Sequence, residues 1–387
     1  MTDIITLDKT YVANTYNRFP IEVSHGKGSL LYDVYGKEYI DLGSGIGVTA
    51  FGYSDTEWIN AVTDQLNKIQ HTSNLYYTKP CAKLASILCD RTGLKKVFFT
   101  NSGAEANECA IKVARKYAED KGIKNAKIIT LKNSFHGRTL TTLAATGQEV
   151  FHKSFLPLTD GFLYLENGNI TELNELVKNN TVCAIMLECV QGEGGVNPVS
   201  QEFMKAVKDV CTKNDILLIV DEVQTGNGRT GKLYAYFYYD VLPDVVTTAK
   251  GLGGGLPIGA CIMGEKVKDT LVPSSHGSTY GGNPVCSAGA INVLERIDDT
   301  VLSEVVSKSK FVKNELSKCK NVLSVTGLGL MLGIKTTKDS KDVVNECVKK
   351  GVLCLTAKDK IRLLPALNID FDLLKKAISI LIDVINE

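Results

Sequence analysis

The sequence predicts an α/β protein built from two domains. Short apolar runs alternate with helical stretches from residue 97 to residue 248, which is typical of buried strands in a mostly parallel sheet. After about residue 290 the order becomes helix, two strands, helix, two short strands and helix, which predicts a smaller α+β unit. The length of 387 residues agrees with more than one core.

The individual elements follow from local patterns. Two alternating runs around Tyr35-Gly36 predict a hairpin over residues 29–42. A helix is predicted after Ser102-Gly103, because apolar residues between Ala106 and Ala118 recur at intervals of three and four. Buried strands are predicted at residues 97–100, 127–131, 183–188, 216–221 and 244–248. The smaller unit is predicted to contain helices 301–317, 341–350 and 371–386, strands 322–326 and 330–335, and short strands around Leu353 and Leu363.

Composition and charge argue against several classes of protein. Lys plus Arg number 44 and Asp plus Glu number 43, with no run of five like charges, so neither nucleic acid nor an anionic membrane is an expected partner. The sequence shows neither a signal peptide nor an apolar stretch of the ~20 residues that cross a bilayer, so we expect a soluble, cytoplasmic protein. Eleven cysteines without a Cys-x-x-Cys pair, and five dispersed histidines, predict reduced thiols and no metal site.

Residues that could bind a ligand or react follow three of the predicted strands. In open parallel sheets, ligands bind beyond these carboxyl ends of the strands. At Ser102-Gly103-Ala104 a helix begins, and its free N–H groups could bind a phosphate or simply be capped by Ser102. Asp221 ends an apolar strand and therefore needs a partner, which could be a protonated cofactor ring, a helix terminus or an arginine. Lys250 follows the next strand, where desolvation would make it an amine nucleophile and base, although most lysines are solvated surface charges.

Three familiar nucleotide and hydrolase patterns are incomplete. Residues 226–232 match the first seven positions of a P-loop, but Leu233 replaces the Ser or Thr that holds magnesium, which disfavours an ATPase. The glycines of residues 251–256 follow Lys250 and lack the third glycine of a dinucleotide-binding fingerprint. Gly-x-Ser-x-Gly is absent, so a serine hydrolase has no nucleophile elbow.

Eight motifs occur in order along nearly the whole chain: Asn101-Ser-Gly-Ala-Glu-Ala-Asn107, Phe135-His-Gly-Arg138, Val190-Gln-Gly-Glu-Gly-Gly195, Asp221-Glu-Val-Gln-Thr-Gly226, Gly228-Arg-Thr-Gly231, Ala249-Lys-Gly-Leu-Gly-Gly-Gly255, His276-Gly-Ser-Thr-Tyr-Gly-Gly-Asn-Pro284 and Arg362-Leu-Leu-Pro365. In this combination they resemble the class III aminotransferases, which are fold type I enzymes dependent on pyridoxal 5′-phosphate (PLP). This resemblance implies a large domain with a mostly parallel seven-stranded sheet between helices (51–289) and a small α+β domain built from both chain ends (1–50 and 290–387).

The resemblance also implies how PLP is held. Lys250 would bind PLP covalently through its side-chain amine and then move the proton between substrate and cofactor. Asp221 would pair with the pyridinium nitrogen and keep the ring protonated. The other implied contacts are Phe135 and Val223 on the two ring faces, Gln224 near the phenolic oxygen, Ser102, Gly103 and Ala104 at the phosphate, and Thr279 at the phosphate bound by the other subunit of a homodimer.

The implied substrates are a terminal amine and an oxo acid. Ser73-Asn-Leu-Tyr-Tyr77 and Ser44-Gly-Ile-Gly-Val48 most resemble family members that transfer the terminal amino group of N-acetylornithine to 2-oxoglutarate in arginine biosynthesis. Arg138 would bind the carboxylate of N-acetylornithine, and Arg362 the α-carboxylate of glutamate or 2-oxoglutarate. Glu193 would neutralise Arg362 when N-acetylornithine is bound, and Ser278 lies beside Thr279.

Two kinds of alternative stay open. Succinylornithine, succinyl-diaminopimelate, ornithine, lysine or 4-aminobutyrate could be the amino donor, because a one-methylene difference changes the binding free energy by only ~1–3 kcal/mol. Ornithine aminotransferases carry a tyrosine near the position of Ile46, and its absence here argues against them. The second alternative is a binding protein without catalysis, which the combination of Lys250, Asp221, Arg138 and Arg362 disfavours.

Overall fold

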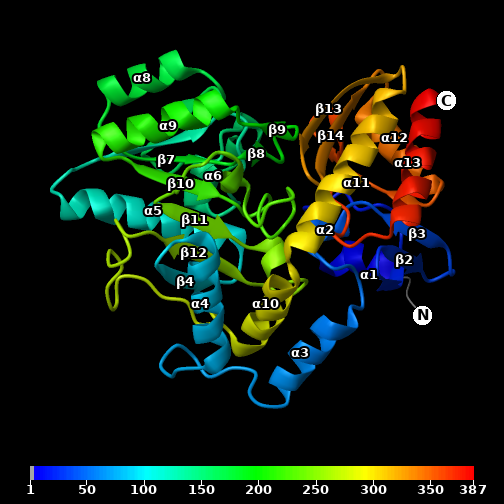
Figure 1. The fold of residues 1–387 in the computed structure, drawn as a ribbon, viewed down its shortest axis with the longest axis horizontal. Helices are drawn as coiled ribbons and strands as arrows, with labels where there is room; N and C mark the ends of the chain where they lie inside the picture. Colours follow the sequence, from blue (N-terminus) through cyan, green and yellow to red (C-terminus); the bar gives the residue numbers. More distant parts are fainter. Residues whose placement is uncertain (1–3) are drawn as a thin grey trace.

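The computed structural model describes residues 4–387, and a seven-stranded sheet forms its centre (Figure 1). The strand order is β4 (Lys96–Thr100), β12 (Gly259–Met263), β11 (Val245–Thr248), β10 (Leu217–Asp221), β7 (Val182–Leu187), β5 (Lys127–Leu131) and β6 (Phe162–Leu165). Only β12 runs antiparallel to its neighbours within this sheet of the described chain. The predicted α/β class with a mostly parallel seven-stranded sheet is therefore confirmed.

Helices cover both faces of the sheet, so its strands are apolar on both sides. In β10, Leu217 and Ile219 pack towards α5 (Gly103–Asp120), whereas Leu218 and Val220 pack in the core that contains residues of α9 (Gln201–Asn214). The remaining helices around the sheet are α3 (Thr56–Leu66), α4 (Lys79–Thr92), α6 (Leu140–Ala145), α7 (Glu149–His152), α8 (Ile170–Asn179) and α10 (Pro284–Arg296), with 3₁₀ turns η1 (Ala235–Tyr238) and η2 (Lys250–Leu252).

Both ends of the chain build the second lobe, on the right of Figure 1. The predicted hairpin is present as β2 (Leu30–Asp33) and β3 (Glu38–Asp41), and β1 (Val23–Lys27) extends it. β15 (Val352–Leu353) adds a parallel strand next to β3, which joins the two ends in one sheet. The other elements are α1 (Ile4–Tyr11), α2 (Ser44–Gly47), α11 (Asp299–Ser317), α12 (Ser340–Lys349), α13 (Phe371–Asn386), and the sheet of β13 (Val322–Leu328), β14 (Met331–Thr336), β17 (Lys360–Leu363) and β16 (Leu355–Ala357).

The two lobes meet close to the carboxyl ends of the central strands. Arg229, which is buried, donates from Nη1 to the carbonyl of Leu330 at 3.2 Å and to that of Pro365. The small hairpin of β8 (Val190–Gln191) and β9 (Asn197–Pro198) packs there as well, with Val196 against Met331. The domain boundaries at residues 50 and 289 stay predictions, although one apolar core does combine Ile40 and Leu42 with residues of α11, α12 and α13.

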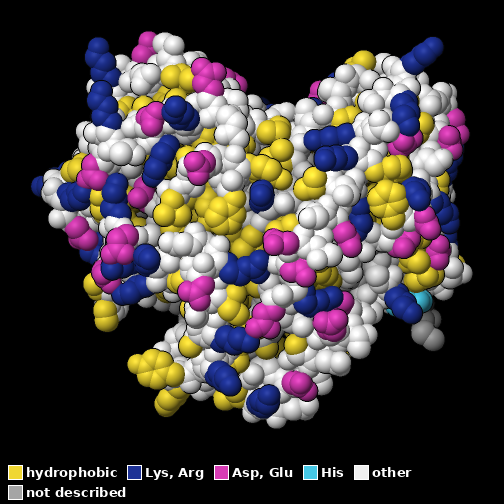
Figure 2. All heavy atoms as spheres, in the orientation of Figure 1, with side chains coloured by type: hydrophobic (Ala, Val, Ile, Leu, Met, Phe, Trp, Pro, Cys, Tyr) yellow, Lys and Arg dark blue, Asp and Glu magenta, His cyan; other side chains and the backbone are white. Residues whose placement is uncertain are grey.

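The surface has no single dominant charge on the face shown in Figure 2, where basic and acidic side chains are interspersed. This agrees with the net charge of +1. None of the helices within residues 4–387 combines the length and the apolar character that crossing a membrane requires.

Candidate active site

A cavity of about 420 Å³ lies at the carboxyl ends of β4, β5, β7, β10 and β11. These strands run in the same direction, so the residues that follow them meet at one edge of the sheet. Nine residues predicted from the sequence line this cavity: Ser102, Gly103, Ala104, Phe135, Arg138, Asp221, Val223, Gln224 and Lys250. Residues 130 or more positions apart along the chain are therefore brought into one site.

The first turn of α5 forms one wall of the cavity. Ser102 caps the helix, because its Oγ accepts from the N–H of Glu105 at 3.2 Å. The N–H groups of Gly103 and Ala104 lie in the first turn of the helix, where no preceding turn offers a carbonyl group as acceptor. They therefore stay available to an anion. A Cβ on Gly103 would lie 2.6 Å from Cγ1 of Val223, so only glycine permits this close approach. The cap that the sequence allowed is therefore present, and it leaves the helix end open to an anion.

The side chain of Asp221 is held by an asparagine and a histidine and not by an arginine. Its Oδ2 accepts from Nδ2 of Asn107 at 2.7 Å and pairs with Nδ1 of His136 at 2.8 Å. Oδ1 accepts from the N–H of Val223 at 2.9 Å, and the side chain is only 3% exposed. Within residues 4–387 no Lys or Arg forms an ion pair with Asp221. A buried carboxylate in this setting favours a positively charged ligand in the cavity.

Asn107 is the residue of this network that the sequence reasoning did not single out. Its Nδ2 also donates to the carbonyl of His136 at 2.7 Å, and its Oδ1 accepts from Oγ1 of Thr247 at 2.6 Å. The hydroxyl of Thr247 thus fixes which way the amide points, so the NH₂ group faces Asp221. An asparagine in the buried stripe of α5, next to Ala106 and Ala110, is the signal that could have identified it.

Lys250 stands at the end of β11 with its side chain in the cavity. Its backbone has a positive φ of 45°, a conformation that non-glycine residues adopt at some energetic cost and that recurs at functional sites. Burial lowers the pKa of the Lys250 amine, and nearby Arg362 lowers it further, while Glu193 and Asp221 act in the opposite direction. A lysine with a lowered pKa offers more neutral amine for nucleophilic attack and proton transfer.

Arg362 and Glu193 form an ion pair beside the cavity. Arg362 is only 3% exposed, and its Nη1 donates to Oε1 of Glu193 and, at 3.2 Å, to Oε1 of Gln224. Burial would raise the pKa of Glu193, but the Arg362 guanidinium outweighs it and holds that pKa below its ordinary value. Nε of Arg362 is buried and finds no acceptor in the described part of the chain. The guanidinium therefore keeps a free donor for a further anion.

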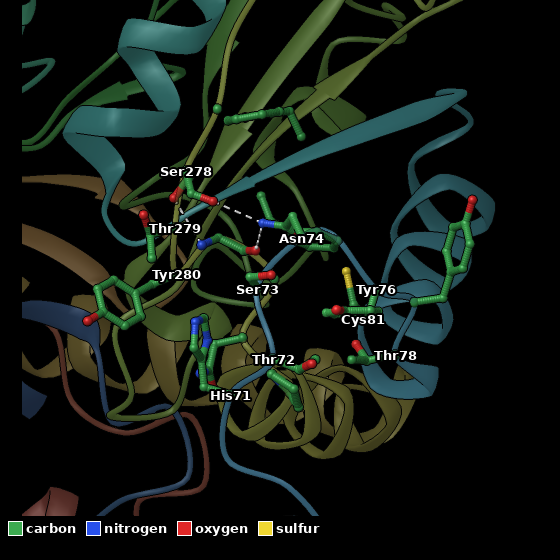
Figure 3. A pocket seen from close by; sticks show the side chains of 18 of the residues that line it. His71, Thr72, Ser73, Asn74, Tyr76, Thr78, Cys81, Ser278, Thr279 and Tyr280 are labelled. Atoms are coloured by element: carbon green, nitrogen blue, oxygen red, sulfur yellow. Dashed lines mark hydrogen bonds between the residues drawn. The ribbon is translucent and has the colours of Figure 1, made fainter. Parts of the chain in front are cut away.

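Ser278 and Thr279 lie outside the Lys250 cavity. They line a separate cavity of about 490 Å³, shown in Figure 3, together with Asn74 and Tyr280. Nδ2 of Asn74 donates to the carbonyl of Ser278 at 3.0 Å, and this hydrogen bond connects the loop of residues 71–78 to the loop that contains Ser278 and Thr279. Within one chain these two residues are therefore not brought to Lys250, in contrast to the other predicted contacts.

Comparison with known proteins decides the family. The model of the family described as "Aminotransferase class-III" matches residues 11–385. The chain belongs to the class III aminotransferases. It is 50% identical to the acetylornithine aminotransferase of Haemophilus ducreyi over 98% of both chains, and 44% identical to that of Aquifex aeolicus over 97% of this chain and 100% of the other.

Solved structures of two aminotransferases match 99% of the chain. Ornithine aminotransferase from Toxoplasma gondii matches with a TM-score of 0.94 and 30% identity, over 99% of this chain and 94% of the other. N-acetylornithine aminotransferase from Stenotrophomonas maltophilia matches with a TM-score of 0.86 and 34% identity, over 99% and 98%. The high similarity to both kinds of enzyme shows that the fold alone does not distinguish their substrates.

The cofactor of a class III aminotransferase is PLP, and the residues of this cavity fit it. PLP carries a phosphate, a ring nitrogen that can be protonated and an aldehyde that reacts with amines. The free N–H groups of the α5 terminus, the buried carboxylate of Asp221 and the amine of Lys250 offer one complementary group for each.

Two more buried carboxyl groups, those of Glu188 and Glu222, lie near Asp221. Glu188 accepts from the N–H of Phe135 at 2.9 Å and from that of Gly192 at 3.1 Å, and burial raises its pKa to about 7. Glu222 accepts from Oγ1 of Thr225 and from the N–H of Tyr236 at 2.8 Å, and burial raises its pKa to about 7 as well. Both groups hold loops in place, and Glu188 does so for the loop that carries Phe135.

Glu222 predicts a pH dependence of stability. Because its pKa rises from 4.5 to about 7 on folding, its contribution to the free energy of unfolding is fully present below pH 4.5 and is lost as the pH rises through 7. Thermal unfolding of Glu222→Gln, followed between pH 5 and pH 8, should therefore show a smaller fall in midpoint with rising pH than the wild type. Equal slopes for the two proteins would contradict this assignment.

Proposed function

We propose that this class III aminotransferase transfers the terminal amino group of N-acetylornithine to 2-oxoglutarate, giving N-acetylglutamate semialdehyde and glutamate, as a step of arginine biosynthesis. The observation that carries the proposal is the 50% identity to the Haemophilus ducreyi enzyme over 98% of both chains. The site supports it, because two arginines, Arg138 and Arg362, accompany Lys250 and Asp221. Two carboxylate-bearing substrates in turn require two such positions.

Lys250 and Asp221 are proposed as the catalytic residues. When bound, PLP supplies an electron-withdrawing ring that stabilises negative charge on the substrate carbon. The neutral amine of Lys250 would hold the cofactor, give way to the substrate amine and then carry a proton to and from the substrate carbon. The carboxylate of Asp221, oriented by Asn107 and His136, would hold a proton on the ring nitrogen.

The remaining cofactor contacts follow from their places in the cavity wall. Gly103 and Ala104 would donate their N–H groups to the phosphate, with Ser102 fixing the helix end. Phe135 and Val223 would pack on the two ring faces, and Gln224 would lie near the phenolic oxygen. Thr279 and Ser278, which lie outside this cavity, would serve the active site of the other subunit in a homodimer. We also propose a cytoplasmic location, in keeping with free cysteines throughout the described chain.

The choice of amino donor is tested by a panel of terminal amines. Purified enzyme with 2-oxoglutarate should turn over N-acetylornithine with a higher kcat/KM than succinylornithine, ornithine, lysine or 4-aminobutyrate. Glutamate formation gives the readout. A clear preference for free ornithine or 4-aminobutyrate would refute the proposed donor without affecting the assignment to the family.

Glu193 is proposed to alternate between two partners. The Glu193–Arg362 ion pair would neutralise the arginine while N-acetylornithine reacts, and would open when glutamate or 2-oxoglutarate brings its own α-carboxylate. Glu193→Ala removes the carboxylate that pairs with Arg362 and leaves Gln224 as the partner of its Nη1. The variant enzyme should bind 2-oxoglutarate better, with a lower KM. Its kcat/KM for N-acetylornithine should decrease by roughly tenfold, as expected for loss of one charged contact. Equal losses in both half-reactions, measured separately by single-turnover absorbance, would argue against this gating.

A further inference from the structure

Arg138 lines the Lys250 cavity and has no polar partner among the described residues. Within residues 4–387 it makes neither a hydrogen bond nor an ion pair, and its side chain is largely exposed. An exposed arginine has many rotamers, and fixing one of them costs conformational entropy. A bidentate clamp on a carboxylate needs the guanidinium plane in one orientation. Something other than a polar contact must therefore orient Arg138.

The guanidinium of Arg138 lies over the ring of Phe151. Cζ of Arg138 lies 4.0 Å from the centroid of the Phe151 ring, and 5.6 Å from that of Phe135. Phe151 is half-buried and is not among the residues that line the cavity. A guanidinium that stacks on a ring is held through its face, so its N–H groups at the edges stay free to bind an anion.

Residues on both sides hold Phe151 in place. The next residue, His152, donates from Nε2 to the carbonyls of Leu143 at 3.0 Å and Thr146 at 2.7 Å, at the C-terminal end of α6. At the start of α7, Nε2 of Gln148 donates to the carbonyl of Ser134 at 3.0 Å. A helix of only four residues has little stability of its own, so these side chains fix the position of the ring.

Phe151 also contacts the aromatic ring proposed for the cofactor. The Phe135 and Phe151 centroids are 5.8 Å apart and their planes make an angle of 77°, the edge-to-face arrangement that aromatic pairs favour. One ring thus contacts both the proposed cofactor-stacking residue and the proposed carboxylate-binding residue.

We infer that Phe151 is a positioning residue that orients Arg138 for the carboxylate of the amino donor, and so favours carboxylate-bearing donors over terminal amines that lack a carboxylate. The inference rests on the proposed function, because it assumes that Arg138 binds the donor. It assigns to Phe151 no contact with substrate. Its effect is exerted through the Arg138 guanidinium alone.

The test compares Phe151→Leu, which removes the ring, with Phe151→Tyr, which keeps it. Two competitive inhibitors of N-acetylornithine turnover separate the two ends of the donor: N-acetylnorvaline retains the carboxylate without the reacting amine, and N-acetylputrescine retains the amine without the carboxylate. In Phe151→Leu the KM for N-acetylornithine and the Ki of N-acetylnorvaline should rise roughly three- to thirtyfold, the range of a cation–π contact. The Ki of N-acetylputrescine should stay unchanged, and Phe151→Tyr should resemble the wild type.

A double variant keeps the test decisive. In an Arg138→Lys background, where a lysine stacks poorly, Phe151→Leu should add little further loss, because both changes remove one contact. Equal weakening of both inhibitors, an additive double variant or an unchanged KM would overturn the inference. Failure of the wild type to use N-acetylornithine would instead refute the proposed function, so the two failures are distinguishable.

Discussion

Replacing Lys250 with alanine should lower kcat by about 10⁴-fold or more. The reason is that the Lys250 amine would both attach the cofactor covalently and transfer the proton. The amine lies in the cavity at the end of β11, and its pKa is lowered by burial. No other lysine lines that cavity within the described residues, so none can take its place. Turnover of N-acetylornithine with 2-oxoglutarate, followed as glutamate formed, measures the loss.

Lys268→Ala is the matched control for this change. Lys268 is a surface lysine whose contact is an ion pair with Glu265, and its removal should leave kcat unchanged. A small primary amine added to Lys250→Ala should restore part of the activity, since the alanine leaves room for it. If Lys250→Ala retained activity within tenfold of the wild type, the assigned role of Lys250 would be wrong.

Replacing Asp221 with asparagine should lower kcat by roughly 10²- to 10³-fold, which is typical for loss of one preorganised electrostatic contact. The amide keeps the shape of the side chain but removes the negative charge that would hold a proton on the cofactor ring. Its NH₂ group would also face the donors of Asn107 and His136, which now bind Oδ2 at 2.7 and 2.8 Å. We therefore expect weaker cofactor binding as well, measured by equilibrium dialysis against PLP.

The neighbouring carboxyl group provides the control for Asp221. Glu222 is equally buried, but its partners are Thr225 and Tyr236, away from the cavity. Glu222→Gln should therefore change stability more than kcat. Similar losses of kcat in Asp221→Asn and Glu222→Gln would show that the loss reflects general damage to the end of β10.

The parts of the fold that the sequence predicts best are those with strong local patterns. The strand that ends at Asp221 and the helix after Ser102 both appear within a residue or two of their predicted bounds, because apolar periodicity is a local property. The meeting of Asp221 and Lys250 was also predictable, since the carboxyl ends of parallel strands lie along one edge.

Contacts that depend on register across the fold were not predictable from patterns alone. Asn107 and Asp221 are separated by 114 positions, and their hydrogen bond depends on how α5 lies on the sheet. Glu193 and Arg362 are separated by 169 positions, and only the family resemblance placed them together. Phe151 lies in a helix of four residues whose position depends on carbonyl groups outside that helix, so no periodic pattern marks it.

The central claim is most directly tested by the visible absorption spectrum of the purified, PLP-loaded protein before and after N-acetylornithine is added without an oxo acid. The account predicts that the visible band of the bound cofactor disappears with N-acetylornithine and returns when 2-oxoglutarate is added. A band that persists in the presence of N-acetylornithine but disappears with another terminal amine would contradict the proposed donor. A wild-type protein that binds no PLP at all would contradict the whole account of the site.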